Sequence, residues 1–256
     1  MNEVVLYEKE GGIGRITLNN PDSSNPFDLK VLQKLIEAFR KSSDNGDVCV
    51  RYEAKGKNFT FGADLKYAYE MITRPELRSE AAEYLWSWQE VTSAMLEHPG
   101  IIIVGYHGWI VGGGFEHTLA CDLRIAADNT RIMLPELGMG IFFSNASTKL
   151  LPRIIGEGRA KQLMLLGEVV RADEALAMGL VNHVCPAEEL DAVMQDYATK
   201  IALKDPLALR LAKRVINEAQ ERSIDEVLYR EGRAMIETGQ SDGTRQRIQA
   251  FVEGEK

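Results

Sequence analysis

Short apolar stretches alternate with segments of helical periodicity in the first half of the chain. Val4 to Tyr7 and Ile13 to Leu18 are predicted to be strands that flank a turn at Gly11-Gly12, and Val48 to Tyr52 is predicted to be the next strand. Between them, Asp28 opens a predicted helix whose apolar residues recur every three to four positions. The buried face of that helix is predicted to consist of Leu32, Leu35, Ile36 and Phe39.

The pattern changes towards the C-terminus. A long helical stretch is predicted for about Pro75 to Leu96, followed by apolar strands at Ile101 to Val104 and Leu123 to Ala126. Beyond Ser144, strand signals nearly vanish except at Leu180 to Val184. Helical periodicity then covers Arg159 to Leu166, Arg171 to Met178, Glu188 to Leu203, Pro206 to Glu221, Ile224 to Thr238 and Thr244 to Phe251. Strands with helices, followed by helices only, predict an α/β core with a helical C-terminal region.

Composition narrows the class of protein. The chain has 256 residues, 45% of them hydrophobic, which is enough for a sizeable core. Its net charge of −8 shows no overall basic bias towards nucleic acid or an anionic membrane, although a local basic patch for a phosphorylated ligand stays open. No apolar run approaches the roughly 20 residues needed to span a bilayer, so we expect no membrane insertion. We expect a cytoplasmic protein, because the N-terminus carries no basic and apolar signal segment.

Three cysteines and four histidines offer little support for disulfides or for a metal site. Cys49, Cys121 and Cys185 cannot all pair within one chain and show no CxxC spacing, so free and mostly buried thiols are expected. We expect no metal ion and no separate cofactor.

A glycine cluster follows the apolar strand at Ile101 to Val104. Gly112-Gly113-Gly114 precedes a stretch, Phe115 to Asp122, that is predicted to be helical. Glycines at a helix start allow a ligand to approach the backbone, and the free N–H groups there can stabilise an oxyanion. The alternative is a tightly packed turn with no ligand. Neither a GxGxxG sequence nor a Walker-type phosphate loop occurs at this cluster.

The cluster is one of several motifs that resemble the enoyl-CoA hydratase/isomerase (crotonase) family. They occur in the family's order at Phe59 to Lys66, Gly112 to Ala126, Leu134 to Gly140, Leu151 to Gly156 and Gly179 to Val184. The resemblance implies an α/β fold with a ββα spiral core at residues 1–195. It also implies a helical C-terminal trimerisation region at 196–256, within the same structural unit, and a homotrimer or homohexamer.

The resemblance also implies a site for an acyl-CoA thioester, with coenzyme A as part of the substrate. The family's oxyanion hole corresponds to the backbone N–H groups of Ala63 and Gly113, and its two catalytic glutamates to Glu116 and Glu136. Two desolvated carboxylates close together do not both ionise easily, so one is expected to have a raised pKa. Taken singly, each glutamate could instead be a helix-start or surface carboxylate.

Further residues that match substrate-contacting positions are Phe61, Gly62, Asp64, Leu65, Lys66, Gly112, Phe143, Ser144, Phe251 and Lys256. For Asp64 the alternative is a helix cap, and Asp122 is expected to anchor a turn. His107 and His117 are expected either to be packing residues or to support the site residues without contacting the substrate. The aromatic residues between Tyr67 and Trp88 either pack in the core or line the acyl pocket, which would then suit a bulky acyl group.

One segment departs from the family pattern. Residues 142–149 lack the family's glycines and carry Phe142 and Phe143. Ser144 occupies a position where dienoyl isomerases, an aryl-CoA dehalogenase and some hydrolases have an aspartate, which argues against those reactions. The resemblance therefore implies an enoyl-CoA hydratase. The alternatives are a Δ3-Δ2 enoyl-CoA isomerase, a hydrolase or decarboxylase of the family, and a scaffold that only binds acyl-CoA.

Overall fold

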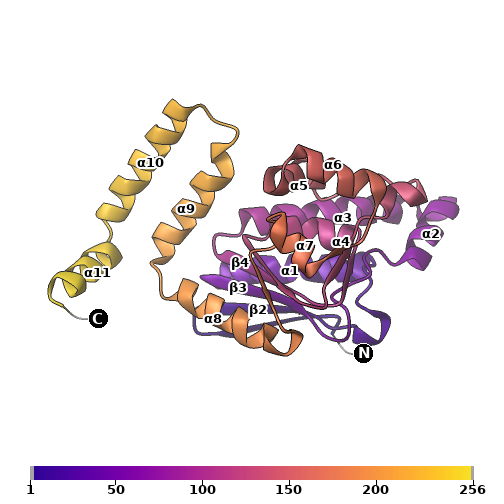
Figure 1. The fold of residues 1–256 in the computed structure, drawn as a ribbon, viewed down its shortest axis with the longest axis horizontal. Helices are drawn as coiled ribbons and strands as arrows, with labels where there is room; N and C mark the ends of the chain where they lie inside the picture. Colours follow the sequence, from indigo (N-terminus) through magenta and orange to yellow (C-terminus); the bar gives the residue numbers. More distant parts are fainter. Residues whose placement is uncertain (1–2, 255–256) are drawn as a thin grey trace.

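A six-stranded sheet forms the centre of the computed structural model, which describes residues 3–254 (Figure 1). The strands lie in the order β1-β2-β3-β4-β6-β9. Only the β1–β2 pair is antiparallel, and the other pairs are parallel. Their bounds are β1 Val5–Glu10, β2 Ile13–Leu18, β3 Cys49–Ala54, β4 Ile101–Tyr106, β6 Leu123–Ala127 and β9 His183–Cys185.

Helices cover both faces of this sheet, which explains the continuous apolar run in β4. Helices α1 and α3 pack together over one face, and α8 packs against β3, β4 and β6 on the other. Along β4, Ile102 and Val104 enter the larger core beneath α1 and α3, whereas Ile103 enters a smaller core with Met194 of α8. The three helices span α1 Leu29–Asp44, α3 Arg78–Glu97 and α8 Leu190–Ala202.

A second, three-stranded sheet supports the glycine cluster. It consists of β5 Trp109–Val111, β7 Arg131–Met133 and β8 Val170–Arg171. These strands are two or three residues long, too short for an alternating pattern to reveal them. Strand β5 ends at Val111, directly before Gly112, and an isolated bridge between Thr60 and Ile110 connects it to the loop after β3.

The remaining helices complete the α/β fold that the sequence predicts. They are α2 Leu65–Thr73, α4 Gly113–Glu116, α5 Ser147–Ile155, α6 Glu157–Leu166, α7 Ala172–Ala177, α9 Pro206–Ala219, α10 Ile224–Gly239 and α11 Asp242–Val252, with 3-10 turns η1 Pro21–Ser23, η2 Pro75–Leu77, η3 His117–Ala120, η4 Glu136–Met139 and η5 Ala187–Glu189. The last three helices extend away from the body of the chain (Figure 1). Residue 196, the boundary expected from the sequence, lies inside α8.

A buried lysine connects this helical extension to the sheet. The Nζ atom of Lys213 in α9 donates to the Gly100 carbonyl at 2.9 Å and to Asp122 Oδ2 at 2.8 Å. The same carboxyl oxygen accepts from the backbone N–H of Ile102 at 2.8 Å. Asp122 therefore ties two backbone segments and α9 together.

Two predicted elements need correction, and one helix was not predicted. The predicted helix Phe115 to Asp122 is wrong beyond α4, because η3 follows and the chain becomes extended at Cys121. The strand expected at Leu180 to Val184 is displaced, since Leu180 lies buried in a loop and β9 begins at His183. The sequence analysis missed α5, whose first turn is polar and which contains Pro152.

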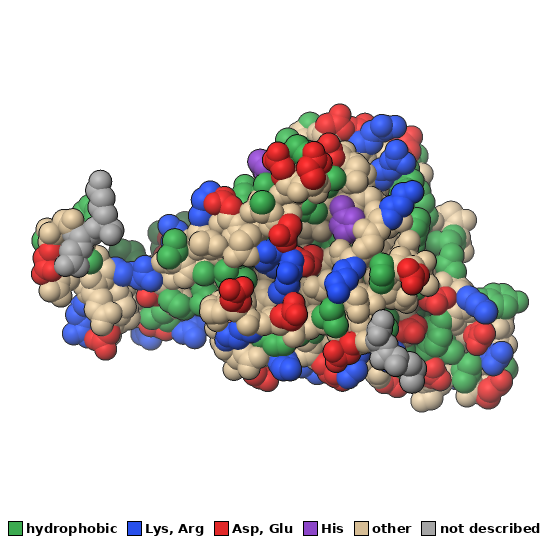
Figure 2. Space-filling view, turned by 90° about the horizontal axis from the view of Figure 1, so that it is seen from below, with side chains coloured by type: hydrophobic (Ala, Val, Ile, Leu, Met, Phe, Trp, Pro, Cys, Tyr) green, Lys and Arg blue, Asp and Glu red, His purple; other side chains and the backbone are tan. Residues whose placement is uncertain are grey.

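The surface and the cysteines agree with the composition. Figure 2 shows acidic and basic side chains interspersed over one face of the molecule. Within residues 3–254, no helix is long and apolar enough to cross a membrane. The same residues contain no group of three or more His, Cys, Asp and Glu side chains that could hold a metal ion. Cys49, Cys121 and Cys185 are free and buried, as expected.

Candidate active site

Neighbouring parts of the site lie so close to the glycine cluster that they leave little room for a Cβ atom at its three positions. Gly112 has a φ of 55°, and a Cβ atom there would lie 2.5 Å from Glu136 Oε1. A Cβ atom on Gly113 would lie 3.0 Å from the Trp88 ring, and one on Gly114 would meet the loop after β3 at 2.4 Å. The turn is therefore tightly packed, and the groups packed against it include a carboxylate and an aromatic ring.

Two backbone N–H groups, one at this turn and one in the loop beside it, donate no backbone hydrogen bond in the described residues. Gly62 has a φ of 79°, and a Cβ atom there would lie 2.5 Å from the Val111 carbonyl oxygen, so its loop lies directly against Gly114. Ala63 follows in that loop, and Gly113 is the first residue of α4. Within the described residues, neither the Ala63 nor the Gly113 N–H donates a backbone hydrogen bond. Such preoriented donors stabilise developing negative charge.

Glu116 and Glu136 lie close enough for their charges to interact. Glu116 is fully buried and Glu136 is 6% exposed. Burial, together with the charge of Glu116, raises the pKa of Glu136 to about 7. Burial also raises the pKa of Glu116, against hydrogen bonds from Ser144 that lower it. Around neutral pH the pair can therefore hold one proton, which provides an acid and a base.

Each of these carboxylates keeps one oxygen without a partner. Glu116 Oε1 and Glu136 Oε2 are buried and accept no hydrogen bond in the described structure. A buried carboxylate oxygen without a donor is costly, so a small polar molecule between the two would stabilise the site.

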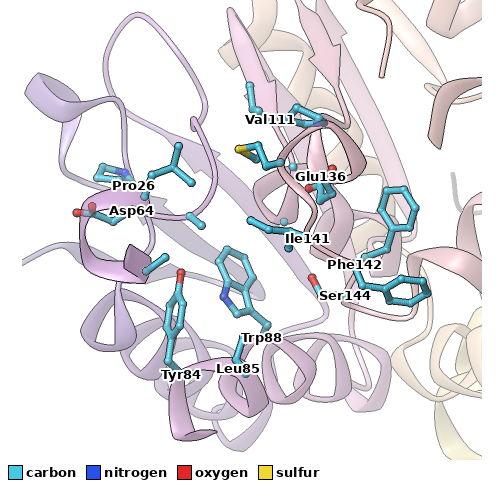
Figure 3. Close-up of a pocket in the computed structure, with 18 of the residues that line it drawn as sticks. Pro26, Asp64, Tyr84, Leu85, Trp88, Val111, Glu136, Ile141, Phe142 and Ser144 are labelled. Atoms are coloured by element: carbon cyan, nitrogen blue, oxygen red, sulfur yellow. The ribbon is translucent and has the colours of Figure 1, made fainter. Parts of the chain in front are cut away.

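A cavity of about 710 Å³ opens beside these groups (Figure 3). Ala63, Gly113, Glu136 and Ser144 line it, whereas Glu116 lies behind the wall, in contact with Ser144. Figure 3 shows Trp88 projecting from α3 towards Ile141, and Tyr84 projecting towards the side of the cavity that carries Asp64. The apolar wall includes Leu65, Ala68, Met71, Ile72, Tyr84, Leu85, Trp88, Met139, Ile141, Phe142 and Phe143.

Most of the residues proposed from the sequence meet at this cavity. Phe61, Asp64, Leu65, Gly112, Phe143 and Ser144 line it, and Gly62 lies in the adjoining loop. Lys66 is exposed and does not line the cavity. Phe251 is 84% exposed on α11, away from the cavity of the same chain, and Lys256 lies outside the described residues.

Two residues with alternative interpretations have clear structural roles. Asp64 caps α2, because its side chain accepts from the backbone N–H groups of Lys66 and Tyr67 at 3.0 Å each. His117 is fully buried between the Gly113 carbonyl, 2.9 Å from Nδ1, and the Tyr52 hydroxyl, 2.9 Å from Nε2.

Burial lowers the pKa of His117 to about 4, so the ring is neutral at pH 7. The Gly113 carbonyl can only accept, so Nδ1 carries the hydrogen and Nε2 accepts from Tyr52. His117 thus supports the turn at Gly113 from within the core, which is one of the two roles expected for it.

The aromatic stretch serves both roles that the sequence left open. Tyr84 and Trp88 line the cavity and are at the same time buried against the core, at 4% and 5% exposure. Tyr69 and Trp86, in contrast, are 68% and 73% exposed and do not line it. Tyr84 and Trp88 therefore belong both to the hydrophobic core and to the cavity wall.

Sequence analysis missed the polar residues that hold the segment containing Ser144. Gln89 Oε1 accepts from the Asn145 backbone N–H at 3.0 Å, and Thr92 donates to Asn145 Oδ1 at 2.9 Å. Gln89 and Thr92 are three positions apart on one face of α3, next to Trp88. Polar side chains on the buried face of a helix were the available signal.

Comparison with known proteins agrees with the architecture. A sequence profile of the family Enoyl-CoA hydratase/isomerase matches residues 8–256. The chain is 33% identical to a short-chain-enoyl-CoA hydratase of Clostridium acetobutylicum, over 100% of this chain and 97% of that protein. It is 31% identical to a crotonyl-CoA hydratase of Syntrophomonas wolfei, over 99% and 96% respectively. It superimposes on a crystal structure of an enoyl-CoA hydratase from Bacillus anthracis with a TM-score of 0.91, at 29% identity and covering 98% and 97%.

The mixed sheets and C-terminal helices therefore form an α/β crotonase fold, as predicted from the sequence. The chain belongs to the enoyl-CoA hydratase/isomerase (crotonase) family. It is a crotonase-family enzyme that acts on acyl-CoA.

Proposed function

We propose that the chain catalyses the reversible addition of water to a trans-2-enoyl-CoA thioester. The observation that carries this proposal is the pair Glu116 and Glu136, each with a buried oxygen that has no partner, next to the free N–H groups of Ala63 and Gly113. The hydratases named among the similar proteins support the same reaction.

The two backbone donors account for activation of the double bond. With the thioester oxygen bound to the Ala63 and Gly113 N–H groups, attack at C3 places the negative charge on that oxygen as an enolate. Preoriented donors stabilise this charge more than they stabilise the neutral carbonyl, which lowers the barrier. Loss of one oxyanion donor of this kind elsewhere costs about 100- to 1,000-fold in rate.

The two carboxyl groups account for the protons. Ionised Glu116 takes one proton from the water as its oxygen bonds to C3, and protonated Glu136 delivers its proton to C2 as the enolate collapses. Proton transfer from Glu116 back to Glu136 restores the starting state. The addition consumes one water molecule and needs no oxidant, reductant or metal ion. The raised pKa of Glu136, about 7, suits it to hold the proton near neutral pH.

The cavity favours a substrate with an uncharged, apolar acyl group. Its wall is formed mainly by Met71, Tyr84, Leu85, Trp88 and Ile141 and their apolar neighbours, and its acidic members are Asp64 and Glu136. Asp64 is engaged as the cap of α2. A carboxylate on the acyl chain would be desolvated there without a cationic partner among the described lining residues.

One observation favours a second candidate, Δ3-Δ2 enoyl-CoA isomerisation. Glu136 lines the cavity, but Glu116 lies behind the wall. A single glutamate that moves a proton between C2 and C4 would suffice for isomerisation, which uses the same oxyanion donors.

The two reactions are distinguished by parallel assays with trans-2-enoyl-CoA and 3-enoyl-CoA of equal chain length. Hydration removes the absorbance of the conjugated enoyl thioester, whereas isomerisation of the 3-enoyl substrate creates it. We expect rapid loss of absorbance with the 2-enoyl substrate. Rapid gain from the 3-enoyl substrate, with no 3-hydroxyacyl product from either, would establish the isomerase instead.

A further inference from the structure

Glu116 is held by a chain of hydrogen bonds that begins on α3. Thr92 donates its hydroxyl to Asn145 Oδ1 at 2.9 Å, and Asn145 Nδ2 donates to Ser144 Oγ at 2.6 Å. Ser144 Oγ then donates to Glu116 Oε2 at 2.5 Å, and the Ser144 backbone N–H donates to the same oxygen at 2.7 Å. Every donor in this chain points towards the carboxylate, so each bond polarises the next.

The backbone of this segment is strained in a way that serves the chain of bonds. Asn145 and Ala146 have φ values of 56° and 53°, in the left-handed region. For alanine this conformation costs about 1–2 kcal/mol. Such strain persists where surrounding contacts determine the conformation, and it is common at functional sites. Here it places both donors of Ser144 on one oxygen of Glu116, while Gln89 holds the Asn145 backbone.

We propose that Ser144, supported by Asn145 and Thr92, is a positioning residue that keeps Glu116 ionised and oriented, so that the shared proton resides on Glu136. The sequence assigned Ser144 to substrate binding. Although it lines the cavity, its hydroxyl is committed to Glu116. The inference rests on the proposed function, in which Glu116 is the base and Glu136 the acid. It adds the residues that keep Glu116 in the ionised state.

The charges around Glu116 are consistent with this assignment. Glu136 faces it across the site, and its charge couples to that of Glu116. His117 is the next residue, but both of its ring nitrogens are bonded elsewhere and it is neutral. Helix α3 contributes uncharged Thr92, and α5 contributes uncharged Ser147.

The test titrates Glu116 directly. In a Glu136→Gln background, only Glu116 of the pair titrates, and its carboxyl stretch can be followed against pH by difference infrared spectroscopy. The band is assigned by its disappearance in Glu116→Gln/Glu136→Gln. Adding Ser144→Ala removes one hydrogen bond to the charged form and keeps the backbone donor. We expect the pKa of Glu116 to rise by about one pH unit.

Substitutions at Thr92 provide a control that leaves the cavity wall unchanged, since Thr92 does not line the cavity. Thr92→Val, which has the same shape without the hydroxyl, should raise the pKa of Glu116 in the same direction by a smaller amount. Thr92→Ser keeps the hydroxyl, so the pKa of Glu116 should equal its value with Thr92 in place. In the enzyme with both glutamates, Ser144→Ala should raise the apparent pKa of the acid limb in the pH profile of kcat/KM.

An unchanged pKa of Glu116 in Ser144→Ala would overturn the inference, even if the variant is slower or melts earlier. The infrared titration requires no turnover. If the wild-type chain hydrates no enoyl-CoA, the proposed function fails while the titration still decides the role of Ser144.

Discussion

The raised pKa of Glu136 has a consequence for stability that can be measured without any substrate. Glu136 has a pKa of about 7 in the folded chain, whereas the ordinary pKa of this carboxyl is 4.5. Between these values the folded state binds a proton that the unfolded state has released. Stability therefore falls as the pH rises through this window, and the full penalty is present above pH 7.

The difference between 4.5 and about 7 corresponds to about 3 kcal/mol at most. The wall of the cavity is open to water, which reduces this figure, so we expect about 2 kcal/mol between pH 5 and pH 8. Glu136→Gln removes the titration and nearly keeps the volume. The free energy of unfolding of the variant should accordingly rise, relative to that of wild type, by about 2 kcal/mol between pH 5 and pH 8.

Urea unfolding at both pH values and at one fixed protein concentration measures this difference. The remaining titrating groups are common to both proteins and largely cancel in the comparison. Glu97→Gln, at an exposed position on α3, is the matched control and should show no such difference. If Glu136→Gln behaves like the control, burial does not raise the pKa of Glu136, and its role as the proton carrier fails with it.

Three further substitutions test contacts at the site and between α9 and the sheet. Gly112→Ala should lower kcat by about 100-fold or more with the fold retained, because its Cβ would lie 2.5 Å from Glu136 Oε1; Gly138→Ala, with nothing within 4 Å, should retain activity. Steady-state kinetics and circular dichroism check both. Lys213→Met should destabilise the fold by about 3 kcal/mol, because Asp122 loses its buried partner; urea unfolding measures this, and a cost below about 0.5 kcal/mol would contradict it.

Long elements with regularly spaced apolar residues were predictable from the sequence, and the shortest strands were not. Helix α1 and strand β4 follow directly from the spacing of their apolar residues. Strands β5, β7 and β8 consist of two or three residues and are specified by their partners in space. Periodicity cannot reveal such contacts, and the strand expected at Leu180 to Val184 was misplaced for a related reason: burial of Leu180 in a loop produces the same apolar signal as a strand.

The same distinction applies to the site. The motifs around Gly113 and Glu136 indicated which backbone and side-chain groups meet at the cavity, because they carry a local signature. The hydrogen bonds from Thr92 through Asn145 to Ser144 join residues more than 50 positions apart. No local pattern encodes them. Residues 142–149 depart from the family pattern, and in the structure Ser144 of this segment contacts Glu116.

The central claim is that Glu116 and Glu136 act together in adding water to the double bond. The most direct measurement follows turnover of a trans-2-enoyl-CoA in H₂¹⁸O and, separately, in D₂O, with mass spectrometry of the product, for wild type, Glu116→Gln and Glu136→Gln. Wild type should yield a 3-hydroxyacyl-CoA with one ¹⁸O at C3 and one deuterium at C2, and each variant should be slower by about 100- to 10,000-fold. Glu116→Gln with the wild-type rate, or deuterium at C2 without any ¹⁸O in the product, would contradict the claim.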